Sequence, residues 1–455
     1  MRAIWSPVSK IRREREFWIA VLEAQRALGV DIPAGAADAY RAVIDDIDLD
    51  SISRRERRLR HDVMARLEEF CELAGCEYLH WGLTSRDLTE NVEQTQIRDG
   101  LALVRTKAVA ALAGTARRAA EFATLPLVAR THNVPAQATT YGRRFAAAGE
   151  ELIGAIGRLE ALIEDYPLRG LKGPVGTQGD LLELLGGDAA KVAALEAALA
   201  ERLSFARTLG AVGQVYPRSM DFDVVSSLFR VATGPADLAT TMRLMAGHEL
   251  LREGFGDEQV GSSAMPHKVN ARSCERLSGL ATVLRGHVTM AAGLAGVQWN
   301  EGDVSCSVVR RIVLPDAFFA IDGVLETYLT ILRELQAFPE VAAAEMRRWG
   351  PLMASSALLR AATDAGSDRS SVHALVQRHS LAAAEAERTG RLYDLAVALG
   401  ADDEFPLGAD AAAAAIEGAL APGRAEAQVT AFVEQATELV NRYPEAGDVV
   451  PEPLL

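Results

Sequence analysis

Apolar residues recur along most of the chain at the spacing of an α-helix. Two sets show it most clearly: Phe145, Leu152, Ile156, Leu159 and Ile163, and then Leu277, Leu280, Leu284, Val288 and Ala291. Successive members lie three, four or seven positions apart, which places each set along one side of a helix. No comparable run alternates apolar and polar residues as a half-buried strand does. The pattern therefore predicts an all-α protein in which several long helices pack into a bundle.

Clusters of Gly and Pro interrupt this pattern and divide the chain. They fall at residues 166–176, 186–187, 234–235, 254–261 and 338–339. With these breaks the sequence predicts an N-terminal domain of short helices (1–92), a central domain of long helices (93–340) and a smaller C-terminal helical domain (341–455). The alanine run at 411–415 is predicted to be helical.

Some central helices carry apolar residues on more than one side, as Leu101, Leu103, Val104 and Ala110 illustrate. A helix that is apolar nearly all round must be buried, and a subunit interface buries it as well as an intrachain core does. This pattern favours an oligomer over a monomer.

Composition narrows the class of protein. Ala and Leu dominate the apolar residues and aromatics make up only 6%, a balance that favours helix over sheet. A net charge of −14 without a basic patch argues against binding to duplex nucleic acid. The four cysteines form no CxxC pair, and no apolar stretch approaches the ~20 residues of a membrane span. These features predict a cytoplasmic protein that binds neither nucleic acid nor membranes.

Candidate chemistry concentrates in residues 261–270, which read Gly-Ser-Ser-Ala-Met-Pro-His-Lys-Val-Asn. Two serines, a lysine and an asparagine bounded by Gly and interrupted by Pro suit a mobile loop that presents hydrogen-bond donors to an anion. A helix is expected to begin just after Lys268, and its first N–H groups also favour negative charge. The alternative from residue types alone is an ordinary surface loop with a helix cap.

This loop resembles the signature loop of the fumarase/aspartase superfamily, which begins Gly-Ser-Ser and continues with Met-Pro, Lys and Asn. The resemblance implies a three-domain helical fold whose central bundle forms the core of a tetramer, with the signature loop at 258–271. It does not by itself identify the substrate.

Four further segments resemble the adenylosuccinate lyases, in an actinobacterial form, in the same order and at similar spacing. They are residues 60–63 (Arg-His-Asp-Val), 80–87 (His-Trp-Gly-Leu-Thr-Ser-Arg-Asp), 130–133 (Arg-Thr-His-Asn) and 299–311. The resemblance implies β-elimination of fumarate from adenylosuccinate, giving AMP, and from its imidazole-carboxamide counterpart SAICAR, giving AICAR. It also implies a homotetramer whose active sites are shared between chains.

The resemblance assigns roles residue by residue. His132 is the general acid that protonates the leaving nitrogen, and Ser262 is the general base, with Ser263 as the alternative. Lys268, Asn270 and the loop N–H groups suit the negative charge that develops on the substrate carboxylate. The implied substrate-binding residues are Arg60, His61, Asp62, His80, Thr84, Ser85, Thr131, Gln214, Lys268, Asn270, Ser307 and Arg311.

Glu275 resembles a family carboxylate that orients a histidine, and its alternative is an exposed helix residue. The His and Cys spacing indicates no metal site, and no cofactor is expected.

The chain departs from the family pattern at three places. Family members usually carry an Arg-Tyr pair just before the region that corresponds to Ile4–Trp5, and this pair contacts the substrate phosphate. The given sequence has no Arg-Tyr pair before Ile4. Gly302 and Asn300 stand where relatives often have Arg and His, and Ala271 replaces a Pro.

The same residues allow two other interpretations. The first is a related fumarate-releasing lyase that acts on another succinyl adduct, and the second is a catalytically silent helical scaffold. The presence of Ser262, His132 and Lys268 argues against the scaffold.

Overall fold

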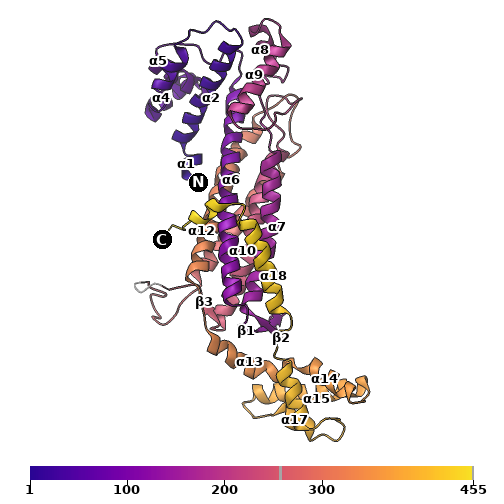
Figure 1. Cartoon of the computed structure of the whole chain (residues 1–455). Helices are drawn as coiled ribbons and strands as arrows, with labels where there is room; N and C mark the ends of the chain where they lie inside the picture. Colours follow the sequence, from indigo (N-terminus) through magenta and orange to yellow (C-terminus); the bar gives the residue numbers. More distant parts are fainter. Residues whose placement is uncertain (256–258, 453–455) are drawn as a thin grey trace. The chain divides into compact units, whose positions relative to one another are not determined.

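The computed structural model describes residues 1–255 and 259–452, and helices dominate these ranges (Figure 1). The N-terminal helices are α1 (Arg2–Trp5), α2 (Pro7–Ala27), α3 (Ala36–Ala42), α4 (Leu49–Leu59) and α5 (Asp62–Ala74). Next along the chain come α6 (Ser85–Glu121), α7 (Tyr141–Asp165), α8 (Gly179–Leu184), α9 (Ala189–Arg202), α10 (Ser219–Gly247), α11 (Arg272–Ala292) and α12 (Ser305–Glu334). The last are α13 (Pro339–Met353), α14 (Ser355–Asp364), α15 (Arg369–Arg388), α16 (Leu395–Gly400), α17 (Ala409–Gly418), α18 (Ala425–Val440) and the 3₁₀ helix η1 (Pro444–Asp448). The predicted all-α class is confirmed.

Two short antiparallel strand pairs are the exceptions within the described residues. β1 (Pro126–Thr131) pairs with β2 (Val134–Thr140), and β3 (Leu251–Arg252) pairs with β4 (Gln336–Ala337). The β1–β2 hairpin was not predicted. Its first strand buries two successive residues, Leu127 and Val128, so its sequence lacks the alternation by which a half-buried strand is recognised.

The chain divides into two compact units. Unit 1 consists of Met1–Lys107, Ala155–Ala232 and Leu280–Val324, and unit 2 consists of Ala108–Gly154, Thr233–Gly279 and Leu325–Leu455. Their boundaries fall inside long helices, and only the one between Ala232 and Thr233 lies beside a Gly and Pro cluster. The linear division into three domains stays a prediction.

Both predicted apolar stripes lie on helices. In α7, Phe145, Leu152, Ile156 and Leu159 are all at most 2% exposed. In α11, Leu277, Leu284 and Ala291 are fully buried. The predicted helix over residues 411–415 is also confirmed, as part of α17.

One predicted break is wrong, because α10 runs without interruption through Gly234 and Pro235. A proline inside a helix removes a hydrogen bond and costs about 3 kcal/mol. Packing compensates for this cost here. A Cβ at residue 234 would stand 2.7 Å from the carbonyl oxygen of Ala148 on α7, so the absent side chain allows the two backbones to approach closely.

The N-terminal part of unit 1 has its own apolar core, built around Phe17, Trp18, Tyr40 and Phe70, each at most 1% exposed. This core fixes α2 and α5 and the segment that follows α5. These elements carry several candidate site residues, so the core sets where those residues lie.

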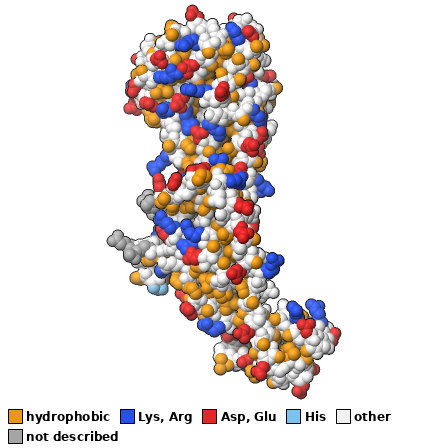
Figure 2. Space-filling view, in the orientation of Figure 1, with side chains coloured by type: hydrophobic (Ala, Val, Ile, Leu, Met, Phe, Trp, Pro, Cys, Tyr) orange, Lys and Arg blue, Asp and Glu red, His pale blue; other side chains and the backbone are white. Residues whose placement is uncertain are grey.

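The surface also carries apolar side chains. Hydrophobic side chains lie exposed among the charged ones in the space-filling view (Figure 2). On α12, Val308, Ile312 and Phe319 are 68%, 46% and 39% exposed, and their spacing of four and seven places them on one side of the helix. Within the described ranges no helix is long and apolar enough to cross a membrane.

Candidate active site

The Arg60–His61–Asp62 turn joins α4 to α5 in unit 1. Arg60 ends α4 in a left-handed conformation, with φ of 53°, and His61 is the N-cap of α5. The Nδ1 atom of His61 accepts a hydrogen bond of 3.3 Å from the backbone N–H of Met64. A ring that accepts at Nδ1 carries its proton on Nε2 in the neutral form. The exposed edge of His61 therefore acts as a donor.

Six of the predicted substrate-binding residues line one cavity of about 530 Å³ in unit 1. They are His61, Asp62, Ser85, Gln214, Ser307 and Arg311. Arg60 lines a second cavity, of about 580 Å³, which shares His61, Asp62 and Arg311 with the first. Residues from α4, α5, α6 and α12, together with the Gln214 segment, thus converge within a single unit.

Charge in the first cavity, of about 530 Å³, is unevenly neutralised. Arg310 lies against Asp221 at 2.7 Å and Glu93 at 2.9 Å, and Asp62 contacts Arg66 at 3.2 Å. Burial alone would raise the pKa of Asp62, but the Arg66 charge holds it below the ordinary value. Of the described cations that line this cavity, Lys10 and Arg311 form no ion pair within 4 Å.

Sequence reasoning missed Lys10, because no motif marks it. It lies on α2, and only the fold brings it to the cavity wall beside His61 and Asp62. Two unpaired cations beside the hydroxyls of Ser85 and Ser307 suit a phosphate or carboxylate.

His80 is held by the N-terminal core. The Nε1–H of Trp18 donates a hydrogen bond of 3.0 Å to Nδ1 of His80. Burial lowers the pKa of His80, although the nearby charge of Asp87 opposes that shift in part. Accepting at Nδ1 also fixes the neutral ring with its proton on Nε2. His80 is therefore suited to donate a hydrogen bond and poorly suited to accept a proton.

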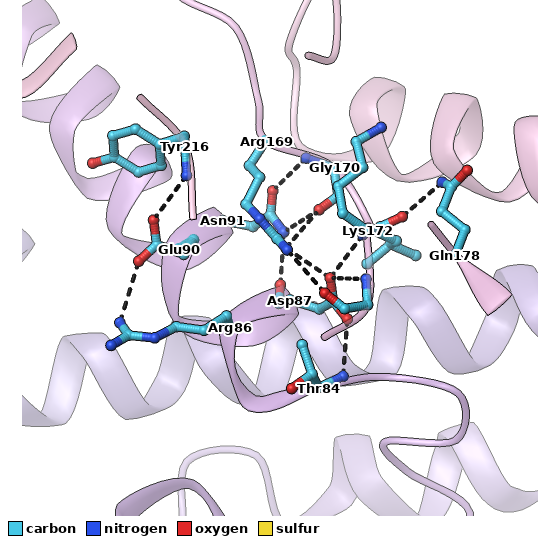
Figure 3. A network of polar contacts seen from close by, with 12 residues as sticks. Thr84, Arg86, Asp87, Glu90, Asn91, Arg169, Gly170, Lys172, Gln178 and Tyr216 are labelled. Atoms are coloured by element: carbon cyan, nitrogen blue, oxygen red, sulfur yellow. Dashed lines mark hydrogen bonds and ion pairs between the residues drawn. The ribbon is translucent and has the colours of Figure 1, made fainter. Parts of the chain in front are cut away.

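Asp87 organises the segment that carries Thr84 and Ser85 (Figure 3). Its Oδ2 accepts a hydrogen bond of 2.9 Å from the backbone N–H of Thr84. Its Oδ1 accepts from Arg169 Nη1 at 2.7 Å, from the Lys172 N–H at 2.8 Å and from the Gly173 N–H at 3.1 Å. Asp87 and Arg169 are both 0% exposed. Their pair is a buried support for the turn at the cavity edge.

The same arginine reaches a second wall of the cavity. Nη2 of Arg169 donates to the carbonyl oxygen of Gly213 at 3.1 Å, and Gly213 directly precedes Gln214. The buried Asp87–Arg169 pair thereby connects the Thr84–Ser85 segment to Gln214. Asp87 lies in one of the segments with predicted site residues, whereas Arg169 lies in the Gly and Pro cluster at 166–176, which was predicted only to interrupt the helices.

Gly302 has a local reason in this chain. Its φ is 150°, and an added Cβ would stand 3.0 Å from the Cβ of Gln214. The backbone N–H of Gln214 donates to the carbonyl oxygen of Glu301 at 2.6 Å. The backbone here packs directly against Gln214, so a side chain at position 302 would displace it.

In unit 2, His132 lies on the turn between β1 and β2. Thr131 pairs with Val134, and the two turn residues, His132 and Asn133, have φ of 53° and 63°. Two successive left-handed residues define a type I′ turn, the connection that best matches the twist of a two-stranded hairpin. His132 is exposed at the tip of this turn, next to Thr131.

The signature loop lies between β3 and α11 in unit 2; its first predicted residue, Glu258, lies outside the described residues. The Oγ atom of Ser262 accepts hydrogen bonds from the backbone N–H groups of Met265, at 3.1 Å, and Ala264, at 3.4 Å. Asn270 Nδ2 donates to the carbonyl oxygen of Gly261 at 3.0 Å. Ser263 and Lys268 are exposed, whereas Ser262 is half-buried.

The first N–H groups of the helix after the loop were expected to favour negative charge, and in the structure two of them bind the carboxylate of Glu253. α11 begins at Arg272, and its Ser273 and Cys274 N–H groups donate to Glu253, a side chain of the chain itself. Glu275 is exposed and faces Arg243 at 3.7 Å. No described group of three or more His, Cys, Asp or Glu side chains could hold a metal ion.

The fold and the signature loop define a lyase of the fumarase/aspartase type. A family model described as "Lyase" matches residues 8–286. A fumarate lyase structure from Mesorhizobium sp. BNC1 superposes with a TM-score of 0.81 at 23% identity, covering 95% of this chain and 97% of that one. A 3-carboxy-cis,cis-muconate lactonizing enzyme from Pseudomonas putida gives a TM-score of 0.83 at 20% identity, covering 96% and 97%. At these identities the two structures establish the fold alone.

Curated sequences narrow the class further. Adenylosuccinate lyase of Saccharomyces cerevisiae is 33% identical over 96% of this chain and 92% of its own length. The enzyme of Schistosoma mansoni is 33% identical over 81% and 78%, and that of Methanothermobacter thermautotrophicus is 31% identical over 86% of each. The chain belongs to the adenylosuccinate lyase family and is a lyase.

Proposed function

We propose that this enzyme releases fumarate by β-elimination from adenylosuccinate, giving AMP, and from SAICAR, giving AICAR. The observation that carries the proposal is the gathering of His61, Ser85, Ser307 and Arg311 around one cavity with cationic walls. A succinylated nucleotide brings a phosphate and two carboxylates, so it calls for a site rich in hydroxyl and cationic donors.

Ser262 is proposed as the base that removes the proton from the carbon next to a substrate carboxylate. A hydroxyl becomes basic only where its anion is stabilised. The Met265 and Ala264 N–H groups that point at its Oγ supply such stabilisation from within the loop, in place of the helix end expected from sequence. Ser263 has no such contact among the hydrogen bonds of the described residues and remains the alternative.

The developing charge and the leaving group need two further functions. Lys268 and Asn270 are proposed to hold the carboxylate as it gains charge, an effect that works best when the donors are fixed beforehand. His132 is proposed as the acid that protonates the departing nitrogen. Thr131 beside it is proposed to bind the substrate, and Glu275 to support the acid.

The residues of unit 1 are proposed to hold the nucleotide. Arg60, Arg311 and Ser307 suit its phosphate and Gln214 suits the succinyl part. His61, His80, Thr84 and Ser85 are proposed to orient the purine ring, and His61 and His80 also to support the general acid. His80 would act as a neutral Nε2–H donor, since Trp18 occupies its other nitrogen.

We further propose a cytoplasmic homotetramer with three domains per chain and active sites shared between chains. The exposed apolar side of α12, with Val308 and Ile312, suits burial against a second copy, and a long helix with such a side is costly to leave in water.

The test is turnover by the purified protein. Fumarate should be released from both adenylosuccinate and SAICAR, which can be followed by the change in absorbance as each substrate is cleaved. This release should vanish in the Ser262→Ala variant, while the circular dichroism spectrum of the variant stays unchanged. Release of fumarate from neither substrate would overturn the assignment. Because Gly302 replaces an Arg common in relatives, turnover of a different succinyl adduct would then favour the related lyase.

A further inference from the structure

A carboxylate ties together the two ends of the signature loop. Glu253 directly follows β3 and is 6% exposed. Its Oε1 accepts a hydrogen bond of 2.7 Å from the backbone N–H of Ser273, and its Oε2 accepts one of 2.9 Å from that of Cys274. Both donors belong to the first turn of α11, so one side chain bridges the residue before the loop and the helix after it.

The side of the loop that carries Glu253 is itself fixed. Leu251 and Arg252 pair with Ala337 and Gln336 of β4, and the hydroxyl of Tyr141 donates to the carbonyl oxygen of Leu250 at 2.9 Å. Glu253 therefore extends from an anchored strand. Its two hydrogen bonds transmit that anchoring to the start of α11.

A second contact closes a smaller ring inside the loop. Asn270 Nδ2 donates to the carbonyl oxygen of Gly261 at 3.0 Å, and a Cβ at Gly261 would stand 2.3 Å from the carbonyl oxygen of Lys268. Ser262 and Lys268 thus lie within a ring whose neck is formed by Gly261 and Asn270. On its C-terminal side only Ala271 separates this ring from α11, whose first turn Glu253 holds.

We propose that Glu253 is a positioning residue that holds the stem of the catalytic loop, and so sets the register in which Ser262 and Lys268 are presented. The inference rests on the proposed function of the loop. Glu253 touches no reacting group in it. A loop tied at its stem loses fewer conformations on closing over substrate than one with free ends, because only the segment between the ties must be ordered.

The competing explanation is that Glu253 is only a helix cap, worth stability but nothing to catalysis. Asp368 provides a matched control, since it is also a carboxylate at a helix N-terminus in unit 2. Its Oδ2 accepts a hydrogen bond of 2.9 Å from the N–H of Ser371 in α15. Asp368→Asn removes the charge of a cap that lies outside the loop, and its activity should equal that of the wild type.

Limited trypsin digestion of the folded protein measures how often the loop opens, and it does not require turnover. The cleavage sites are Lys268 in the loop and Arg272, the first residue of α11. Glu253→Gln should speed cleavage at these sites at least ~10-fold, since weaker anchoring opens the segment more often. Its kcat should fall ~10-fold while KM changes less than about threefold, because the variant alters the reactive geometry and leaves the nucleotide cavity intact.

Ser273→Pro is the second variant and removes one of the two donors while leaving the carboxylate in place; proline is tolerated in the first turn of a helix. It should reproduce the fall in kcat and the faster cleavage after Lys268. Lys268 is the site to compare in this variant, because trypsin does not cleave after Arg272 when proline follows it. Ser273→Pro carries the test if Glu253→Gln does not fold. The proposal would be overturned if, in either folded variant, both the cleavage rate and kcat lay within about twofold of the values for Asp368→Asn. Faster cleavage with unchanged kcat would overturn it as well. A wild-type protein that released no fumarate would refute the proposed function instead, and the digestion result would still stand.

Discussion

Replacing Asp87 by Asn should destabilise the fold much more than the same change at a partly exposed carboxylate. Asp87 and Arg169 are both 0% exposed, and the two oxygens of Asp87 accept four hydrogen bonds, three of them from backbone N–H groups. An asparagine has one acceptor oxygen. Whichever way its amide is turned, an NH₂ group must face an N–H donor, and Arg169 loses its buried counter-charge. Breaking a buried pair in this way costs about 3–5 kcal/mol.

The comparison is Asp99→Asn. Asp99 contacts Arg13 at 2.7 Å and Arg98 at 3.0 Å, but it is 33% exposed, so its pairs should be worth only about 0–1 kcal/mol. Urea unfolding followed by circular dichroism measures both losses. Protein concentration must be matched, because assembly adds to apparent stability. An Asp87→Asn loss below about 1 kcal/mol, or one equal to that of Asp99→Asn, would refute the assignment of Asp87 and Arg169 as a buried support.

Three further changes test the cavity and the C-terminal helices. Trp18→Phe removes the donor to Nδ1 of His80; the pKa of His80 should rise from its lowered value, and the acid limb of the pH profile of kcat/KM should move to higher pH. Lys10→Met should raise KM about tenfold with kcat nearly unchanged, measured by steady-state kinetics against Lys191→Met, because Lys191 is likewise partly buried but lines neither cavity. Hydrogen bonding from His379 and from the Glu404 N–H lowers the pKa of Asp402 to about 2, so the stability it adds is present above its ordinary pKa and is lost as the pH falls toward 2. The difference in Tm between wild type and Asp402→Asn should shrink over that interval.

The sequence was sufficient for the elements whose signal is local. The stripe from Phe145 to Leu159 identifies one side of α7, and the polar loop around Lys268 is evident from its residue types. Interactions between distant residues were not visible in this way. α10 continues through Pro235 because a neighbouring glycine lets it pack closely, and that gain appears only when the partner helix is known.

The site shows the same limit. His80 could be proposed from its flanking residues, but its role as a neutral donor depends on Trp18, 62 positions away in the chain. The helix after the signature loop was expected to stabilise an anion, which is a sound rule for a helix end in isolation. In the structure the carboxylate of Glu253 accepts hydrogen bonds from two N–H groups at that helix end. The rule that a helix N-terminus attracts negative charge holds here, but the fold supplies the anion from a residue that no spacing in the sequence connects to the helix.

The sharing of active sites between chains can be tested by mixing two inactive variants. Ser262→Ala keeps His132, and His132→Ala keeps Ser262, so each variant lacks one of the two proton-transfer groups. If both groups of one site came from the same chain, a mixture would stay inactive. If they come from different chains that assort at random from an equal mixture, about one site in four receives both intact residues. After unfolding and refolding together, activity should therefore approach about 25% of wild type, and refolding each variant alone gives the background. Mass measurement must first show that mixed tetramers have formed. If they have, activity no greater than that background would refute shared sites. The roles of Ser262 and His132 in the elimination would still be tested by the kinetics of each single variant.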